Sequence, residues 1–393
     1  MKPLIVHLSA DYPDAIAPGK TRAIERLVTG TASRFAHRVY SLNRRGGIGA
    51  AMLGTGGVEP ATDDGMLASW TYRAPAAGLA MRRAMSGVAD AVLADLAARG
   101  LEPAIIQGHK LSFEGIAARQ VARSLGVPFA VTLQGNTDRK VLRARPDLAG
   151  TYRSVWHGAE AVFAFAPWIA DWCSERLGRR GKPPISLPCI TNAQQTLAPR
   201  TEVAPRVVSA FNLDDWRNKN VAHLVAAITR LRKTFPEACL EIAGSGSGEA
   251  QAAVDAIIRD AGAGGFVRRI GSIAPASIQQ WMNGAAAFAM PSQRESFGMV
   301  FVEALLSGCP IVYSRGTAVD GYFPGAPFAR ACDPGNASDI AANLGAILES
   351  RAEAVSALER WQAGEAQRFL APAILKAYGD EMERLADGAA GED

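Results

Sequence analysis

Cysteine, long apolar runs and targeting signals are all scarce in this sequence. Its 393 residues include 5 cysteines, an odd number without any Cys-x-x-Cys pair. We therefore interpret the cysteines as reduced packing residues of a cytosolic protein, because a disulfide framework or a zinc site needs them in pairs or clusters. The first apolar run, Leu4 to Val6, is too short for a signal peptide, and no run approaches the length of a membrane span. We expect a cytoplasmic protein.

An excess of one charge is also missing. The formal net charge is +4, with 20% charged residues, which argues against a dedicated nucleic-acid binder. Basic residues do gather at 82–83, at 139–145 and at 179–182. Each group is most simply solvated surface. Together they could contact anionic lipid head groups, so a peripheral place on the inner face of a membrane stays open.

Two glycine-containing segments approach nucleotide-binding motifs without completing them. Gly19-Lys20-Thr21 lacks the glycine that a P-loop has five residues earlier, where this chain has Asp14, and this excludes a P-loop ATPase. Residues 244–248 follow a predicted strand and precede a predicted helix, but the third glycine is one position early for a dinucleotide fingerprint. No acidic residue ends the next strand at the expected distance, so a dinucleotide enzyme is not predicted.

The chain does contain a repeated alternation of short apolar runs and segments with apolar residues at helical spacing. The first half predicts strands at 3–9, 37–42, 104–106, 127–133, 161–165 and 185–190, and helices at 21–31, 76–99, 116–125, 149–158 and 168–177. The second half predicts strands at 206–210, 238–243, 267–273, 285–290 and 311–313, and helices at 221–232, 250–260, 278–283, 297–306, 340–362 and 369–385. This alternation is typical of doubly wound α/β folds, so we expect two Rossmann-like domains.

Composition predicts where the domains divide. Residues 193–205 are polar and contain two prolines, which indicates an interdomain linker. The predicted segments are 1–195, 205–370 and a last helix at 371–393. The glycine-rich residues 43–65 are expected to form a long loop.

Residues 285–312 are the most informative part of the chain. They read as a strand, a polar loop, a helix and a second strand, with Glu295 just before the helix and Glu303 about two turns into it. The first amides of such a helix, at Phe297 to Met299, are unpaired donors that suit an anion, and Gly298 leaves room for a ligand. Two carboxylates beside an anion site are suited to accepting hydrogen bonds from hydroxyl groups. A phosphate together with hydroxyls indicates a nucleotide sugar.

This stretch resembles the Glu-x7-Glu motif of retaining glycosyltransferases of the GT-B fold, family four type. The match includes Pro-Ser before Glu295, Phe-Gly after it, Glu-Ala at Glu303 and the Gly-x-Pro-Ile-Val exit at 308–312. An ordinary strand-helix-strand unit with solvated glutamates is the alternative. The resemblance implies an α/β protein with two Rossmann-like domains that face each other across a cleft. It implies transfer of a hexose from a nucleotide-diphosphate sugar to a glycan, lipid-linked or small-molecule acceptor, with retention of anomeric configuration.

The resemblance also implies roles for individual residues. Catalysis is assigned to Lys219 on the leaving diphosphate, to Glu295 on the sugar and to His109 in the first domain. The implied donor-binding residues are Gly19, Asn212, Arg217, Gly244, Gly246, Ser272, Ile273, Phe297, Gly298, Met299, Val300 and Glu303. The family's usual diphosphate arginine is missing because Asn212 occupies its place, and Arg217 is the candidate replacement.

The family resemblance of the first domain is looser. His109 and Gly-Val-Pro at 126–128 match, but Gln134 stands where relatives often have a second histidine. Gln134 can position a substrate but cannot carry a proton or a charge. For His109, a satisfied histidine at a strand end and a site residue are both open. The first domain is expected to bind the acceptor, the second the donor, and the last helix to return to the first domain.

Neither a metal ion nor a cofactor is expected. No Asp-x-Asp pair follows a predicted strand, and Lys219 with the helix dipole could stabilise the diphosphate instead. Two alternatives share the ligand: a nucleotide-sugar epimerase, which Gln134 disfavours because it offers no acid–base group, and a non-catalytic nucleotide-sugar-binding module of an envelope assembly.

Overall fold

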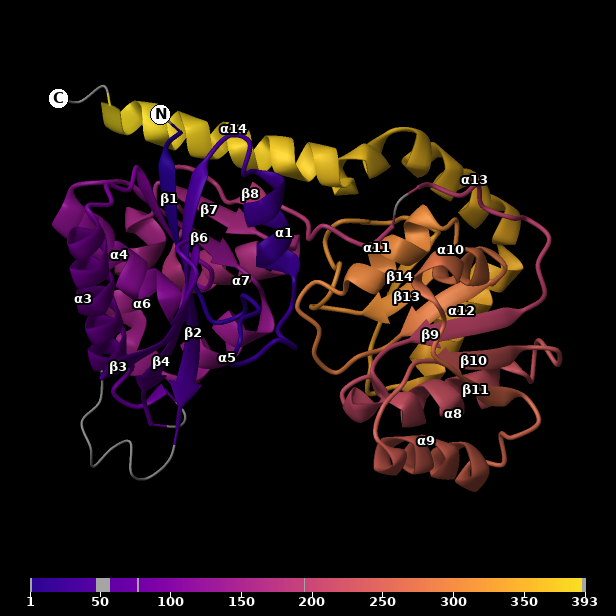
Figure 1. The fold of residues 1–393 in the computed structure, drawn as a ribbon. Coiled ribbons are helices and arrows are strands. Elements are labelled where there is room, and N and C mark those ends of the chain that lie inside the picture. Colours follow the sequence, from indigo (N-terminus) through magenta and orange to yellow (C-terminus); the bar gives the residue numbers. More distant parts are fainter. Residues whose placement is uncertain (1, 47–56, 76–77, 194, 391–393) are drawn as a thin grey trace. The chain divides into compact units, whose positions relative to one another are not determined.

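The structure, a computed structural model, describes residues 2–46, 57–75, 78–193 and 195–390. The chain divides into two compact units: the first contains Met1–Ile190 and Ala371–Asp393, and the second contains Thr191–Leu370. Each unit is a mainly parallel sheet covered by helices (Figure 1). The predicted α/β class with two Rossmann-like domains is confirmed.

The first unit is built on an eight-stranded sheet in the order β3-β4-β2-β1-β5-β6-β7-β8. Its strands are β1 (Leu4–Ser9), β2 (Ala36–Arg45), β3 (Val58–Asp63), β4 (Leu67–Arg73), β5 (Ile105–Gly108), β6 (Phe129–Leu133), β7 (Ala161–Ala164) and β8 (Ile185–Ser186). The pairs are parallel except for β3 with β4. From β1 the chain continues to β2 on one side and later to β5 on the other. The boundary between β1 and β5 is thus the switch point, and the carboxyl ends of the strands there are where such sheets bind ligands.

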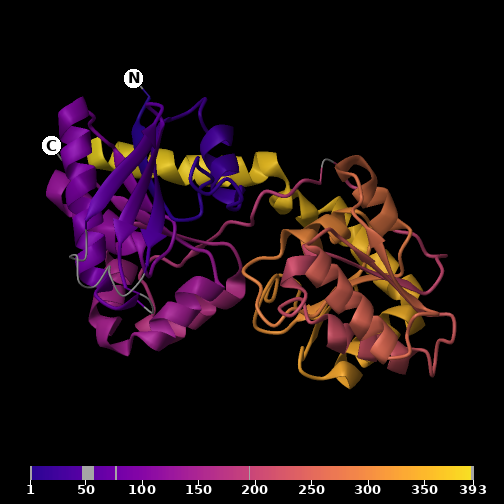
Figure 2. The ribbon, with the colours of Figure 1, turned by 60° about the horizontal axis from the view of Figure 1, so that its bottom comes forward.

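Seven α-helices belong to the described part of the first unit. They are α1 (Ala23–Gly30), α3 (Met81–Arg99), α4 (Glu114–Leu125), α5 (Asn136–Ala144), α6 (Ala149–Gly158), α7 (Pro167–Leu177) and α14 (Ala371–Ala390). Helix α14 lies along the first unit (Figure 2). Its Tyr378 is fully buried, donates to Oε1 of Gln107 and has its ring 5.3 Å from that of Phe163. Among the described helices, none has both the length and the apolar character needed to cross a membrane.

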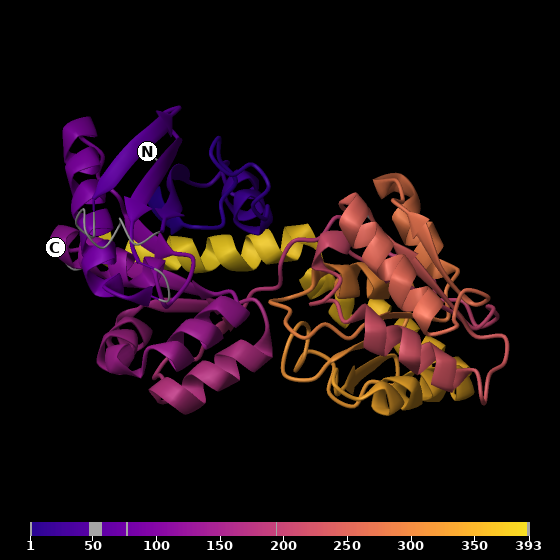
Figure 3. The same ribbon diagram turned by 90° about the horizontal axis from the view of Figure 1, so that it is seen from below.

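The second unit has a six-stranded parallel sheet in the order β11-β10-β9-β12-β13-β14. Its strands are β9 (Arg206–Ala210), β10 (Cys239–Ala243), β11 (Val267–Gly271), β12 (Ala287–Met290), β13 (Ile311–Ser314) and β14 (Ala329–Cys332). Its α-helices, which cover the sheet (Figure 3), are α8 (Val221–Leu231), α9 (Gly248–Asp260), α10 (Pro275–Asn283), α11 (Met299–Leu306), α12 (Ala337–Glu349) and α13 (Arg351–Ala363). The switch point lies between β9 and β12, so the loops that follow these two strands meet at the same sheet edge.

The prediction of a loop over residues 43–65 is wrong at both ends. Strand β2 continues to Arg45, and β3 occupies Val58–Asp63 at the sheet edge, where mostly exposed polar residues and a proline are tolerated. Glu59 of β3 pairs with Arg73 on the neighbouring strand β4 and with Arg45 at the end of β2, the next strand in the sheet. Such charged edge pairs give no apolar periodicity, so the sequence did not reveal them. The remaining residues of the predicted loop, 47–56, lie outside the described residues.

Other predicted elements differ in their limits. The helix expected at 340–362 is two helices, α12 and α13, that meet at Ser350. The strand expected at 185–190 is only Ile185–Ser186. The helix expected at 76–99 begins at Met81, and residues 76–77 lie outside the described residues. Strands β4 and β14 and helix α5 were not predicted.

The described residues of the predicted linker are attached to the second unit. The amide of Leu197 donates to Leu306 O at 2.8 Å, and Nε2 of Gln362 donates to Leu197 O at 3.1 Å. Nδ2 of Asn283 donates to Ala198 O at 2.9 Å. These backbone contacts make the segment part of the second unit, and residue 194 lies outside the described residues.

Candidate functional site

The loops after β9 and β12 bring Lys219 and Glu295 into direct contact, although 76 residues separate them. Nζ of Lys219 donates to Oε2 of Glu295 at 2.5 Å, and Oδ2 of Asp215 lies 3.8 Å from the same nitrogen. The side chains of Lys219 and Glu295 are 14% and 18% exposed. They are therefore held in place but remain accessible to a ligand.

Two asparagines fix the loop that carries Lys219. Asn220 has a left-handed backbone (φ 62°), and its buried Nδ2 donates to Pro291 O at 3.1 Å and to Pro334 O at 2.6 Å. Nδ2 of Asn218 donates to Arg294 O at 3.0 Å. These bonds connect the β9 loop to the β12 loop on both sides of Lys219. The sequence offered one signal, since asparagine tolerates positive φ better than most residues do.

Gly298 starts helix α11 and has a structural reason to be glycine. Its φ is +72°, and a Cβ there would lie 2.7 Å from the ring of Phe301 and 3.0 Å from Cγ of Glu295. The helix begins at Met299, so its first-turn amides are those of Met299 and Val300, which have no carbonyl one turn earlier. These two donors and the positive end of the helix dipole follow Glu295 by only a few residues, so they lie next to the Lys219–Glu295 contact.

Phe297 is not part of the helix. Its side chain is 2% exposed and packs edge-on against Tyr322, with 6.1 Å between ring centroids. Expecting it in the first helical turn was therefore wrong by one to two residues. Glu295 is held from the other side: its amide donates to Oγ1 of Thr317 at 2.9 Å, and that hydroxyl donates back to Glu295 O.

Glu303 lies within α11 and is half-buried. One of its carboxylate oxygens accepts a hydrogen bond from the amide of Asn192 at 2.9 Å. A carboxylate can accept about four hydrogen bonds, so this contact leaves acceptor capacity for ligand hydroxyls. The structure thus gives Glu303 a structural partner in addition to its predicted ribose contact.

The two glycines assigned to donor binding in the β10–α9 loop are explained by packing. Gly244 has φ +145°, and a Cβ there would lie 1.9 Å from Phe211 O. A Cβ at Gly246 would lie 2.8 Å from Cβ of Leu213. The amide of Leu213 donates to Ser245 O at 2.8 Å, so the two loops lie tightly together. The glycines are needed for this close approach, and their contact with the donor stays a prediction.

Asn212 and Arg217 also have local partners. Oδ1 of Asn212 accepts a hydrogen bond from the amide of Asp214 at 3.0 Å and caps the short turn after β9. The guanidinium of Arg217 lies 4.3 Å from the ring centroid of Trp216. Arg217 is exposed, so it keeps its charge available to an anion.

For the remaining predicted donor-binding residues, the structure adds little support. Ser272 and Ile273 lie in the loop after β11, two strands away from β9 in the sheet. Gly19 has nothing within 4 Å of the position of a Cβ, so no close approach requires a glycine. The neighbouring Lys20 is engaged, because its Nζ donates to Oδ2 of Asp14 at 3.0 Å.

His109 is a buried core histidine of the first unit. Its Nε2 lies 3.0 Å from Nδ1 of His7, whose Nε2 lies 3.0 Å from Nδ1 of His37. Burial, and then the charge of Lys110, lower the pKa of His109 to about 3, so the imidazole is neutral near pH 7. His109 is 1% exposed, and its Nδ1 has no hydrogen-bond partner among the described residues, so the catalytic role expected from the sequence stays a prediction. Gln134 is also buried, and its Nε2 has no hydrogen-bond partner in the part of the chain that the structure describes.

Sequence reasoning missed a charged cluster at the β1–β5 switch point. Nζ of Lys110 lies 2.5 Å from Oδ2 of Asp11 and 3.7 Å from Oε1 of Glu114. Burial alone would lower the pKa of Lys110, but the two carboxylates outweigh it and the pKa is raised. Asp11 and Lys110 each follow the carboxyl end of a strand, and this shared position was the available signal.

The second unit matches a known family. Residues 208–364, which include Lys219, Glu295 and Glu303, match the model of the family described as glycosyl transferases group 1. The second unit is a group 1 glycosyl transferase domain. The resemblance seen in the Glu-x7-Glu motif is thereby confirmed for this unit.

Solved structures resemble the whole chain. A sucrose-phosphate synthase from Thermosynechococcus elongatus aligns with 98% of this chain and 100% of its own, at 18% identity and a TM-score of 0.69. HepE from Anabaena in complex with UDP and glucose aligns with 97% of this chain and 100% of its own, at 15% identity and a TM-score of 0.64. At these identities the likeness shows the fold alone, and the fold is GT-B.

Curated relatives align with part of the chain. A glycogen synthase from Mycobacterium tuberculosis (strain CDC 1551 / Oshkosh) is 29% identical over 140 residues, which are 35% of this chain and 32% of the relative. An MMP alpha-(1->4)-mannosyltransferase from Mycolicibacterium hassiacum is 29% identical over 136 residues, 34% of this chain and 32% of the relative. The match thus spans about a third of each relative's length.

Proposed function

We propose that this chain is a retaining glycosyltransferase that moves a hexose from a nucleotide-diphosphate sugar to an acceptor. The observation that carries the proposal is the contact between Lys219 and Glu295 at the start of α11, inside the group 1 domain. A cation, a carboxylate and two helix amides supply the groups that a diphosphate and sugar hydroxyls need. The UDP and glucose in the HepE complex support a nucleotide sugar as donor.

The reaction breaks the bond between the anomeric carbon and the diphosphate oxygen. Lys219 and the amides of Met299 and Val300 stabilise the charge that grows on the leaving diphosphate. Glu295 accepts hydrogen bonds from sugar hydroxyls and orients the ring, and Glu303 accepts from the ribose. The acceptor oxygen bonds to the anomeric carbon from the face that the diphosphate leaves, its proton passes to the diphosphate, and the configuration is retained.

The contact between Lys219 and Glu295 couples diphosphate binding to sugar binding in this mechanism. A diphosphate that binds the helix amides competes with Glu295 for Nζ of Lys219. When the diphosphate replaces Glu295 at this nitrogen, Glu295 can accept hydrogen bonds from the sugar hydroxyls of the same donor. Both side chains are partly exposed, so water can replace each partner during the exchange.

We propose that no metal ion takes part, because Lys219 and the helix amides supply the positive charge. The donor would bind the second unit, near 205–370, and the acceptor the first, 1–195 with the helix at 371–393. Arg217 remains the candidate for a second cation on the diphosphate.

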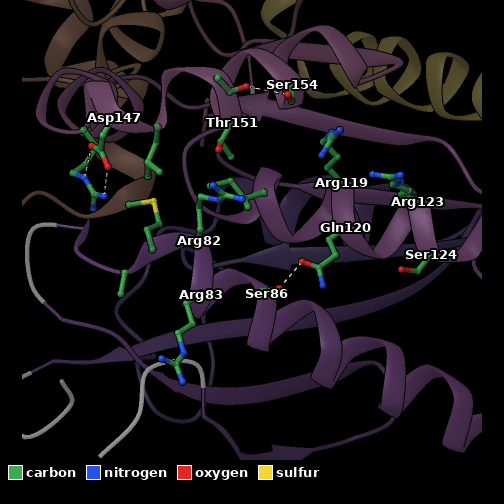
Figure 4. A pocket seen from close by; sticks show the side chains of 16 residues that line it. Arg82, Arg83, Ser86, Arg119, Gln120, Arg123, Ser124, Asp147, Thr151 and Ser154 are labelled. Carbon is green, nitrogen blue, oxygen red and sulfur yellow. Dashed lines mark hydrogen bonds and ion pairs between the residues drawn. The ribbon is translucent and has the colours of Figure 1, made fainter. Parts of the chain in front are cut away.

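We also propose that the first unit contacts an anionic membrane. A groove of about 1170 Å³ lies among α3, α4 and α6 (Figure 4). Four of its arginines have no ion pair among the described residues: Arg82, Arg83, Arg119 and Arg123. The groove's one carboxylate, on Asp147, is paired with Arg145 at 2.5 Å. Each arginine near an anionic bilayer contributes about 1 kcal/mol of attraction.

Vesicle sedimentation tests the membrane contact. The chain should bind phosphatidylglycerol vesicles and not phosphatidylcholine vesicles. Arg82→Ala with Arg119→Ala should weaken binding about tenfold or more, whereas Arg230→Ala with Lys233→Ala, an equal loss of charge in the second unit, should not. Equal effects of the two pairs would remove the groove from the contact.

A screen of nucleotide sugars tests the reaction class. Slow release of nucleoside diphosphate and free sugar from one donor, abolished by Lys219→Ala, is the expected result. Interconversion of nucleotide sugars without diphosphate release would instead indicate an epimerase. Donor binding without turnover, with and without candidate acceptors, would indicate a binding module.

A further inference from the structure

A second cavity in the first unit, of about 490 Å³, lies at the carboxyl side of the sheet. It is bounded by the segments that end β2 and β4, by the start of α3 and by α5. The residues that line it are Arg44, Tyr72, Ala74, Pro75, Gly78, Leu79, Met81, Ala84, Met85, Phe113, Thr137, Lys140, Val141 and Ala144. Its volume is within the range of cavities that enclose small ligands.

The walls of this cavity are apolar. Most lining side chains are aliphatic, aromatic or thioether groups, and none carries a carboxylate. A bare glycan would bring many hydroxyl groups here and leave most of them without partners, which is unfavourable for binding. Leu79 at the cavity is 59% exposed, the most exposed of the large apolar side chains in the described part of the chain. These features favour a hydrocarbon occupant.

Two cations accompany the apolar wall. Arg44 and Lys140 line the cavity, both are exposed, and neither has an ion pair among the described residues. The guanidinium of Arg44 donates to Pro75 O at 3.0 Å, which holds it at the cavity. Two cations without a carboxylate suit a ligand with an anionic head.

The inner part of the cavity lies near the switch point. Tyr72 is 6% exposed; burial and then Glu114 raise its pKa to about 12, while Arg44 and Lys110 oppose them. Phe113 also lines the cavity and directly precedes Glu114, whose Oε1 lies 3.7 Å from Nζ of Lys110. The cavity therefore adjoins the sheet edge where α/β folds carry out their chemistry.

We propose that this cavity is the apolar subsite for the acceptor, and that the acceptor is an amphiphile with a hydrocarbon chain and a phosphate-type head. This inference rests on the proposed glycosyltransferase function and selects the lipid-linked class among the acceptors that the sequence left open. The chain lies against Met85, Phe113 and Val141, and the head meets Arg44 and Lys140. The acceptor oxygen belongs to the polar end.

Alkyl phosphates below their micelle concentration are suitable probes, titrated into the full chain by calorimetry. Dodecyl phosphate should bind one molecule per chain. Affinity should rise about fourfold for each methylene from the octyl to the dodecyl compound. Dodecyl maltoside, which has a neutral head, should bind more weakly, and inorganic phosphate should not bind. Inorganic phosphate that binds as tightly as dodecyl phosphate would overturn the apolar subsite.

Two variants connect the binding to this cavity. Ala144→Phe fills the cavity from an exposed helix position and should weaken dodecyl phosphate binding by about tenfold or more, whereas Ala98→Phe, at an exposed position of α3 outside the cavity, should not. Lys140→Ala should weaken dodecyl phosphate but not dodecyl maltoside, and Arg153→Ala should affect neither. Thermal melting of each variant verifies folding. Wild-type affinity in a folded Ala144→Phe protein would overturn the assignment.

Different results would refute the lipid-linked acceptor and the glycosyltransferase function. If no alkyl phosphate binds while the wild-type protein still hydrolyses a nucleotide sugar, the acceptor class is wrong and the glycosyltransferase function stands. If alkyl phosphates bind as expected but the wild-type protein turns over no nucleotide sugar, the proposed function fails, and the acceptor role of the cavity fails with it.

Discussion

Replacing Lys219 by alanine should impair turnover far more than folding. The side chains of Lys219 and Glu295 are 14% and 18% exposed, although their charged atoms are 2.5 Å apart. A partly solvated ion pair of this kind contributes about 0–1 kcal/mol to the free energy of unfolding. For a unit of this size, its loss should lower Tm by at most about 4 °C.

The effect on catalysis should be much larger. Lys219 acts on charge that appears on the diphosphate as the glycosidic bond breaks, so its contribution is greater in the transition state than in the bound donor. We expect kcat to fall about 10²–10³-fold, as for the loss of one preorganised electrostatic donor. The donor KM should rise by a smaller factor.

Lys219→Ala should weaken binding of the product nucleoside diphosphate, and Glu295→Gln should strengthen it. Glu295 accepts a hydrogen bond from Nζ of Lys219, and glutamine is a weaker acceptor. The lysine becomes available to a diphosphate, so affinity for the nucleoside diphosphate should rise, by up to about fivefold if the pair is worth 1 kcal/mol. Turnover should still fall, because the sugar hydroxyls lose a charged acceptor.

Calorimetric titration with UDP, the diphosphate in the HepE complex, separates the two variants. If the screen identifies another base, the corresponding diphosphate replaces UDP. Lys233→Ala, which removes an exposed lysine of the same unit, should match the wild type. Undiminished affinity in Lys219→Ala together with weaker binding in Glu295→Gln would reverse the assigned roles and refute this view of the site.

Three further predictions concern the ribose contact, metal and pH. Glu303→Gln should raise the donor KM by the equivalent of about 1–3 kcal/mol, and an unchanged KM in a folded variant would remove Glu303 from the site. Activity should persist in EDTA, and full dependence on added Mg²⁺ or Mn²⁺ would contradict the mechanism. Burial lowers the pKa of His7, of His37 to about 4 and of His109 to about 3, so they stay neutral when folded and take up protons on unfolding below about pH 6.5. Stability should therefore fall as pH falls from 6.5 towards 4, by up to about 1.4 kcal/mol per pH unit for each histidine. A Tm that does not change between pH 7 and pH 4.5 would show that these histidines are not buried as neutral groups.

The second unit was the more predictable part of the chain. Its central strands β12 and β13 are fully buried and read as apolar runs, and α8 has most of its apolar residues on one face. In α5, by contrast, the only buried residues are Asp138 and Leu142, so apolar periodicity gave no signal. Asp138 is buried because Ser112 donates to it from its amide and its hydroxyl, at 2.9 Å and 2.6 Å. A tertiary contact of this kind has no local signature.

In the site, too, local sequence patterns could be predicted and tertiary contacts could not. Lys219 and Glu295 could be selected from the sequence because both belong to motifs with fixed positions relative to a strand end. Their mutual contact could not, since it depends on Asn218 and Asn220 bonding to carbonyls more than 70 residues away. The close approach of Phe211 O to Gly244 could not be predicted either, because a glycine pattern does not distinguish a ligand from the protein's own backbone.

Lys110 and Lys219 lie at the two switch points, and their burial determines which of them can bind an anionic ligand. Lys110 is 7% exposed and its partner Glu114 is 1% exposed, so separating them would leave an uncompensated buried charge, at about 3–5 kcal/mol. Lys219 and Glu295 retain contact with water, so an incoming anion can replace the carboxylate at small cost. We therefore expect the diphosphate to bind the second unit. In the first unit Lys110 remains with its carboxylates, so the anionic head of the proposed acceptor would depend on Arg44 and Lys140, which have no ion pair among the described residues.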